Sequence, residues 1–403
     1  MKRRDFLRYS IGGGLVLAQP QLLFAANKEQ PLYNAHLYNP TRHLFIADSE
    51  SSQITIFNVM YDKYIDTLNF NVQPETIELA RDDSMMLVGN SESTDLILYD
   101  LKTSLRRDME LPSPLYRAVY VPQSKLVAMV MRDQVAMLDY HKGQLTTYDA
   151  PTAISAQNQD SNQEPKVLFS SFTRTFWVLD ENKAQIYRKS AYEPDDKPWQ
   201  TIDLSARAST NLSAGFDGGV ITPGDYMMAL TTKQGNEGYV YYIDQDKLYS
   251  TGPMGGSDSP SGSMIRPYID SSFKRVLFAD SNGNVALFDF DKSEKAEHFK
   301  VDFTPREFRT GWLETTLIIG GDKGLQFQSF NDPNDKVFFE LPSGVVDMWV
   351  TGDSKTLYVT LQEGEPRVLR YDIRRRVELK PLLIHGVIKG AALRMGSTNS
   401  ICH

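Results

Sequence analysis

Short runs of apolar or alternating residues recur along the whole chain, and polar turns separate them. Eight of these runs share one form, in which the run usually closes on an aromatic or apolar residue followed by Asp or Asn. They occupy residues 54–58, 96–100, 135–139, 184–188, 240–244, 285–289, 325–328 and 368–372. Their last residues lie 42, 39, 49, 56, 45, 39 and 44 residues apart. Such a period is typical of the four-stranded blade of a β-propeller.

The first two repeats show the order of strands most clearly. Residues 35–39, 43–47, 54–58 and 64–70 read as four strands, and residues 76–80, 85–90, 96–100 and 106–111 repeat the same order. We therefore predict an all-β chain that forms a single closed propeller of eight four-stranded blades. Seven blades are the alternative if one of the less regular repeats is an insertion. Residues 386–393 are expected to pair with the first blade, because an open ring leaves unpaired strand edges.

The N-terminal residues have the order of an export signal. Arg3 and Arg4 precede Asp5-Phe6-Leu7, and apolar residues at 11–18 and 22–26 follow before a polar segment. The pattern resembles a twin-arginine (Tat) signal peptide. We therefore expect a signal peptide over residues 1–26, a propeller domain with a short C-terminal tail over 27–403, and export to the periplasm by the Tat pathway. No stable membrane insertion is expected after cleavage, because residues 19–21 interrupt a run shorter than the ~20 apolar residues that a bilayer requires.

Net charge narrows the class of partner. The chain carries a formal charge of −8, and removal of residues 1–26, with four basic residues and one acidic residue, makes the remainder −11. An acidic protein repels phosphate backbones, so nucleic acid is not an expected partner. We expect a protein partner or a small ligand.

Few residues suggest chemistry. Cys402 is the single cysteine, which excludes an internal disulfide and leaves an exposed tail or an intermolecular disulfide as the alternatives. The six histidines have no metal-ligand spacing, and no catalytic motif is present, so we predict no metal site and no catalytic residue. Spacing leaves His36 and His385, near the ends of inner strands, as candidates for cofactor ligation. No sequence motif identifies a cofactor.

The order of an inner strand, a turn, Leu44-Phe45-Ile46-Ala47-Asp48, a small polar turn and Ile54-Thr55-Ile56-Phe57-Asn58 resembles YVTN-type propellers. The wider superfamily includes the quinoprotein amine dehydrogenase propellers and the haem-binding propeller of nitrite reductase. The resemblance covers residues 33 to about 395 and lies in the strand order, so it implies the fold more strongly than a function. The Gly-His to Trp-Asp signature of WD repeats is absent from the sequence.

The turns between the second and third strands of the repeats carry acidic residues. In a propeller these turns emerge on one face, so we expect their carboxylates to form a rim that binds a basic protein or a cationic ligand. A solvated surface is the alternative interpretation. The function that we predict is therefore a binding or scaffold protein, and the alternative is a haem- or quinone-type oxidoreductase or a cofactor-handling protein with its site at the central channel. The rim candidates are Asp48, Glu50, Glu92, Asp133, Asp180, Glu237, Asp280, Asp322 and Glu363.

Overall fold

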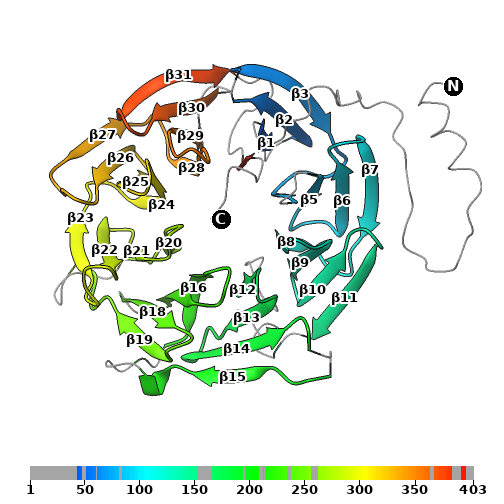
Figure 1. Ribbon diagram of the computed structural model, residues 1–403, viewed down its shortest axis with the longest axis horizontal. Helices are drawn as coiled ribbons and strands as arrows, with labels where there is room; N and C mark the ends of the chain where they lie inside the picture. The colour runs from blue at the N-terminus through cyan, green and yellow to red at the C-terminus, as the bar shows by residue number, and fades with distance from the viewer. Residues whose placement is uncertain are drawn as a thin grey trace, which may run out of the picture.

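Eight four-stranded antiparallel sheets stand in a ring around a central channel (Figure 1). The computed structural model describes residues 43–47, 51–59, 61–80, 84–149, 151, 166–193, 196–207, 212, 214–233, 237–255, 262–363, 367–383 and 392–395. Apart from one short 3-10 helix, η3 (Ser205–Arg207), the regular elements in these ranges are all strands. The prediction of an all-β propeller with eight blades is confirmed, and the seven-bladed alternative is wrong.

Blades 1 to 4 follow one another along the chain. From the centre outward, blade 1 holds β32 (Ala392–Met395), β1 (His43–Ala47), β2 (Gln53–Asn58) and β3 (Lys63–Asn69). Blade 2 holds β4 (Thr76–Leu79), β5 (Met85–Gly89), β6 (Asp95–Asp100) and β7 (Leu105–Glu110). Blade 3 holds β8 (Leu115–Tyr120), β9 (Leu126–Met131), β10 (Gln134–Asp139) and β11 (Gln144–Asp149). Blade 4 holds β12 (Val167–Ser170), β13 (Thr175–Leu179), β14 (Gln185–Ser190) and β15 (Gln200–Asp203).

Blades 5 to 8 complete the ring. Blade 5 holds β16 (Phe216–Ile221), β17 (Met227–Thr232), β18 (Gly238–Tyr242) and β19 (Lys247–Ser250). Blade 6 holds β20 (Tyr268–Ile269), β21 (Arg275–Ala279), β22 (Asn284–Asp289) and β23 (Glu297–Lys300). Blade 7 holds β24 (Pro305–Gly311), β25 (Thr316–Gly321), β26 (Gly324–Ser329) and β27 (Lys336–Glu340). Blade 8 holds β28 (Val345–Val350), β29 (Thr356–Leu361), β30 (Arg367–Asp372) and β31 (Val377–Leu383).

The repeated runs of the sequence are the third strands of these blades. The second strands are buried without interruption in cases such as β1 and β5, because a neighbouring blade covers each face of the sheet. The fourth strands, such as β27 and β15, alternate or are exposed because they form the outer edge of the ring. Burial on both sides thus explains why the apolar runs lose the simple alternation of a half-buried sheet.

The hydrophobic core is divided among the contacts between blades. Eight clusters of buried side chains lie between neighbouring blades, one for each contact in the ring. The cluster that joins the last blade to the first contains Tyr358 and Val368 from blade 8 and Leu44, Ile46 and Phe57 from blade 1. Each blade therefore depends on both neighbours for its burial.

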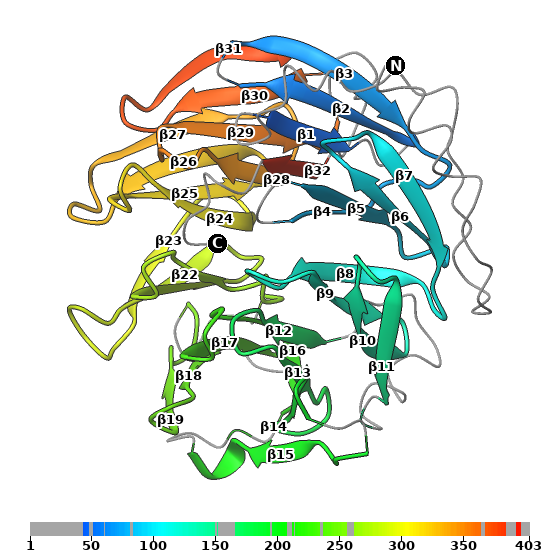
Figure 2. The same cartoon turned by 45° about the vertical axis from the view of Figure 1, so that its right-hand side comes forward.

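The C-terminal strand closes the ring. Strand β32 pairs with β1 in antiparallel register, with Leu44 opposite Met395 and Ala47 opposite Ala392 (Figure 2). The predicted pairing of this region with the first blade is confirmed for residues 392–395, while residues 386–391 of the predicted run lie outside the described ranges. Because β32 takes the innermost place of blade 1, the prediction of that place for residues 35–39 is wrong, and those residues lie outside the described ranges.

Within the described ranges, the structure has no helix that is long and apolar enough to cross a membrane.

Candidate functional site

The innermost strands line the channel, and four of them carry a β-bulge at the same place. The bulges follow the first residue of β8, β16, β24 and β28. In β24, Pro305 lies opposite Gly321 and Glu307 lies opposite Gly320, so Arg306 is the extra residue. In all four strands the two residues after the buried first position are accessible, and the next one is buried. The bulge therefore interrupts the alternation that would put consecutive side chains on opposite faces.

A cavity of about 450 Å³ lies against the channel wall of blades 5 to 8. It extends from the start of β24, at Arg306, to the loops that follow β16 and β20, at Pro223 and Phe273. Its volume is in the range of pockets that hold small organic molecules. The residues that line it include the apolar Val220, Pro267, Phe273 and Val346 and the polar Arg266, Tyr268, Arg306, Glu307 and Arg309.

Three charged side chains form a network in this wall. The Arg309 guanidinium lies 2.5 Å from a Glu307 carboxylate oxygen and 3.6 Å from an Asp347 carboxylate oxygen on the neighbouring blade. Arg309 also donates hydrogen bonds to the backbone carbonyls of Met348, at 2.8 Å, and Phe308, at 2.8 Å. This network joins β24 to β28 and holds Arg309 in place.

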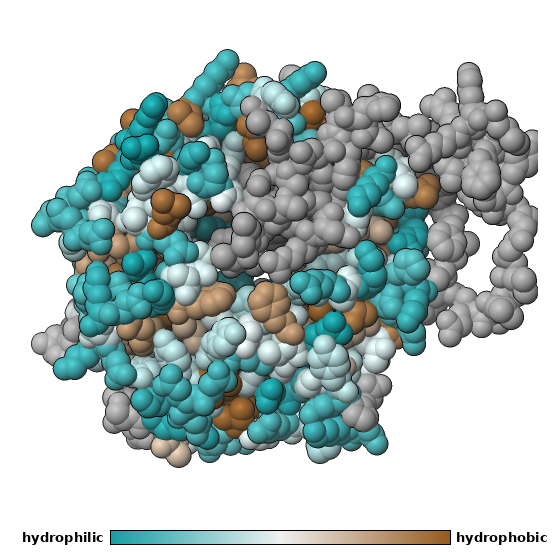
Figure 3. All heavy atoms as spheres, viewed as in Figure 1, coloured by the Kyte–Doolittle hydropathy of each residue, from teal (hydrophilic) through white to brown (hydrophobic). Residues whose placement is uncertain are grey.

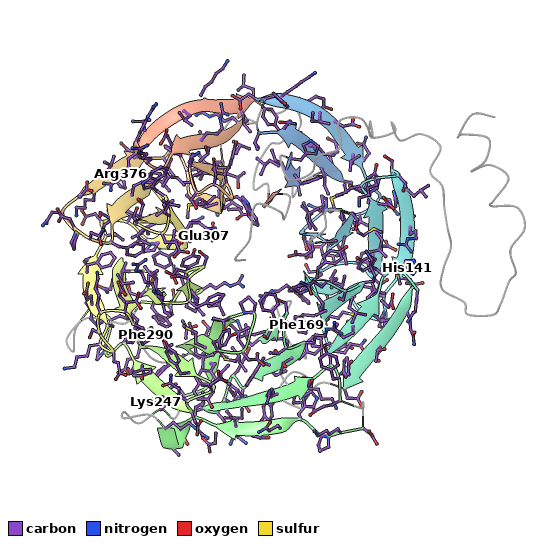
Figure 4. The ribbon with its side chains drawn as sticks, in the orientation of Figure 1. His141, Phe169, Lys247, Phe290, Glu307 and Arg376 are labelled. Carbon is purple, nitrogen blue, oxygen red and sulfur yellow. The ribbon has the colours of Figure 1, made fainter. Side chains whose placement is uncertain are left out.

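Glu307 is the member of this network whose carboxylate group is only partly hydrogen-bonded. Its side chain is only 22% exposed, and the buried oxygen Oε2 has no hydrogen-bond partner among the described residues. Burial raises the pKa of Glu307 to about 7, and the nearby Asp347 carboxylate raises it as well, while the charge of Arg309 opposes the shift. Glu307 is also one of the residues that line the cavity. Figure 4 shows Glu307 on an inner strand beside the central opening, whereas Arg376 lies near the outer edge of the ring.

Arg306, the residue that the bulge adds, is exposed. Its guanidinium has a long contact of 3.4 Å to the carbonyl oxygen of Val345, and it forms no ion pair within the described part of the chain. Arg266, which precedes β20, is also exposed and lines the same cavity. The face seen in Figure 3 is mostly hydrophilic along its outer edge.

The acidic turns predicted from the sequence connect the second and third strands of their blades. Glu92, Asp133 and Glu363 are exposed in those turns. Asp322 and Glu237 are partly buried: Asp322 accepts a hydrogen bond from the Thr304 amide at 2.9 Å, and Glu237 accepts hydrogen bonds from the Tyr239 and Ser250 hydroxyls at 3.0 and 2.8 Å. The rim as a docking surface stays a prediction, with three exposed carboxylates among its described members.

Two of the rim candidates are buried and accept hydrogen bonds from residues of their own turns. Asp180 accepts hydrogen bonds from the amides of Asn182 and Lys183 and from the Tyr187 hydroxyl. Asp280 is fully buried and accepts three hydrogen bonds from Asn282 and Asn284. These carboxylates stabilise turns and do not present charge to a partner. The remaining candidates, Asp48, Glu50, His36 and His385, lie outside the described residues, as does Cys402.

Sequence reasoning named the central channel as the site of its alternative function but missed the residues of the channel wall. Nothing in the order of Pro305, Arg306 and Glu307 distinguishes a bulge from a regular strand, because proline is found both at the first residue of a strand and at bulges. Carboxylates and guanidinium groups from β24 and β28 are about 40 residues apart in the sequence and meet only through blade packing. Among the described residues, no group of three His, Cys, Asp or Glu side chains is placed to hold a metal ion.

Comparison with known proteins shows that this chain is similar to solved structures. No protein-family profile matches the sequence, and no curated protein matches it. The chain is similar to the solved structure of dihydro-heme d1 dehydrogenase NirN in complex with DHE, with a TM-score of 0.67 and 12% identity over 93% of this chain and 84% of that chain. The shared feature is the propeller fold. Apo AztD from Citrobacter koseri is similar with a TM-score of 0.58 and 12% identity over 87% of this chain and 97% of that chain.

Proposed function

We propose that this protein is an exported β-propeller that binds a small organic ligand in the channel cavity of blades 5 to 8. One observation carries the proposal, namely a cavity of about 450 Å³ that brings exposed guanidinium groups and an unsatisfied carboxylate oxygen to apolar walls. Binding pockets for small molecules combine these features, with apolar surface for affinity and a few polar groups for orientation. Buried polar atoms without partners cost free energy, so a ligand that pairs with Glu307 gains from that deficit.

The comparison with NirN supports the proposal. That propeller is similar in fold and was solved with the ligand DHE bound. Handling of a haem-like cofactor is therefore the more specific form of the proposal, and it predicts a visible absorption band from the purified protein. The resemblance of residues 1–26 to a Tat signal supports export to the periplasm as part of the same proposal.

The test uses protein recovered from the periplasm, with the ligand that it carries. Val346 lines the cavity from β28 and is 38% exposed, so Val346→Trp should fill the cavity without opening the core. The matched control is Val377→Trp on the outer strand β31, where the valine is 42% exposed. Each protein is denatured, and the released small molecules are analysed by mass spectrometry and by visible absorption.

We expect a small molecule in stoichiometric amount from the wild type and from Val377→Trp, and its loss from Val346→Trp. The same small molecule at equal yield from all three proteins would place the ligand elsewhere. A wild type that releases no molecule, and that no compound in a thermal-shift screen stabilises in a Val346→Trp-sensitive way, would refute the proposal.

A further inference from the structure

The bulge in β24 gives the cavity two adjacent charged side chains. In a regular strand Arg306 and Glu307 would point to opposite faces, so one of them would be lost from the channel. Because Arg306 is the extra residue of the bulge, both side chains line the cavity. Val346, the extra residue of the bulge in β28, lines the cavity next to them.

The charge that remains for a ligand at this wall is that of the Arg306 guanidinium. Arg309 is neutralised by Glu307 and Asp347, and it is held by two backbone carbonyls. Asp270 is fully buried and lies 3.6 Å from the Arg275 guanidinium. It also accepts hydrogen bonds from the Lys274 and Arg275 amides, so its interactions are with residues of its own loop and strand.

Arg306 is the exposed charge at this wall that no carboxylate of the described chain neutralises. Arg266, from the neighbouring blade, is also exposed and lines the same cavity. A guanidinium group matches a carboxylate with two parallel hydrogen bonds, and desolvation beside apolar side chains strengthens that pair.

Building on the proposed function, we propose that the ligand is an organic carboxylate with an apolar body, and that its carboxylate lies against the Arg306 guanidinium. Val220, Val346 and Phe273 supply apolar surface for the body. The Tyr268 hydroxyl is already engaged with Thr310 at 3.1 Å, which leaves the ring of Tyr268 as further wall. Glu307 borders the carboxylate site and limits how much negative charge the site accepts.

Three probes with one apolar body and different heads test this class of ligand. Naphthalene-2-carboxylate is anionic, naphthalene-2-carboxamide is neutral, and 2-naphthylmethylammonium is cationic. Their dissociation constants are measured by calorimetry at pH 8 with ligand-free wild type. We expect the carboxylate to bind at least about tenfold more tightly than the amide, and the ammonium to bind most weakly.

Two substitutions shift the preference in opposite directions. Arg306→Gln should make the carboxylate and the amide bind equally, while Arg375→Gln, at a 78% exposed side chain in the outer hairpin of blade 8, should leave the preference unchanged. Glu307→Gln should tighten carboxylate binding several-fold at pH 8, because it removes the neighbouring negative charge. Misfolding cannot produce such a gain.

The outcomes separate this inference from the proposed function. If all three probes bind equally and Val346→Trp abolishes their binding, the cavity is a ligand site but its preference for carboxylates is wrong. Tighter binding of the ammonium would likewise overturn the inference and point to Glu307 as the recognition group. If no probe binds in a Val346→Trp-sensitive way, both the inference and the small-ligand cavity fail.

Discussion

His43 shows how burial of a single side chain makes stability depend on pH. The residue begins β1, is fully buried, and its ring lies 6.3 Å from that of Phe45 in an edge arrangement. Burial lowers the pKa of His43 to about 4, because the charged imidazolium would lose its hydration. The folded protein therefore holds His43 neutral, while the unfolded chain takes up a proton near the usual pKa of about 6.5.

The expected consequence is a loss of stability in acid. The contribution of His43 is fully present above pH 6.5 and is lost as the pH falls toward 4, by up to about 3 kcal/mol. In His43→Phe this loss should be absent, so the wild type should weaken relative to the variant between pH 7 and pH 4. Free energies of unfolding from denaturant titrations measure the difference. His141→Phe, at an exposed residue, is the control and should follow the wild type. A parallel pH profile for His43→Phe and the wild type would contradict the assignment.

At the scale of elements, the ring depends on one short strand. Strand β32 has four residues, and it supplies the innermost strand of blade 1. Farther from the channel, the Arg370 guanidinium of β30 pairs with the Asp62 carboxylate in the turn that precedes β3, and buried side chains of blades 8 and 1 pack together. Loss of β32 exposes the edge of β1, and the closure of the ring then rests on the contacts between blades 8 and 1 alone.

Truncation tests the role of β32. Deletion of residues 392–403 should lower the melting temperature by several degrees and promote aggregation, because the edge of β1 becomes available for intermolecular pairing. Deletion of 396–403 keeps β32 and serves as the matched control, with the melting temperature of the full chain. Thermal melts and light scattering after gel filtration give the readout. Two truncations that behave alike would mean that β32 does not stabilise the ring.

At the scale of the whole molecule, the contacts between first and last blades require the complete chain before the ring closes. A pathway that exports folded proteins suits this architecture, and the N-terminal resemblance predicts such a pathway. Replacing Arg3 and Arg4 together by Lys should leave the precursor in the cytoplasm, because lysine does not reproduce the guanidinium group. Cell fractionation measures the distribution. Arg8→Lys is the control outside the pair, and normal export of the double variant would exclude the Tat pathway.

The sequence by itself determined the repeat and most of the strands. Apolar runs such as 54–58 and 285–289 carry local information, since burial between two blades requires continuous apolar residues and turns require polar ones. The prediction that residues 386–393 pair with the first blade followed from the same logic, because a ring needs its edges paired. Positions of equivalent turns were also predictable, because each is fixed by the strands that flank it.

The tertiary structure decided how individual side chains are used. Asp280 is indistinguishable from Glu92 by its place in the repeat, yet Asp280 is buried within its hairpin and Glu92 is exposed, because packing around each turn differs. The bulge that places Arg306 beside Glu307 depends on the register with β25, which is a property of two paired strands. Asp347 of blade 8 lies near Arg309 of blade 7 only because the two blades pack against each other. Local pattern specifies which segments are strands, whereas convergence of distant charges depends on register and blade packing, which no local pattern encodes.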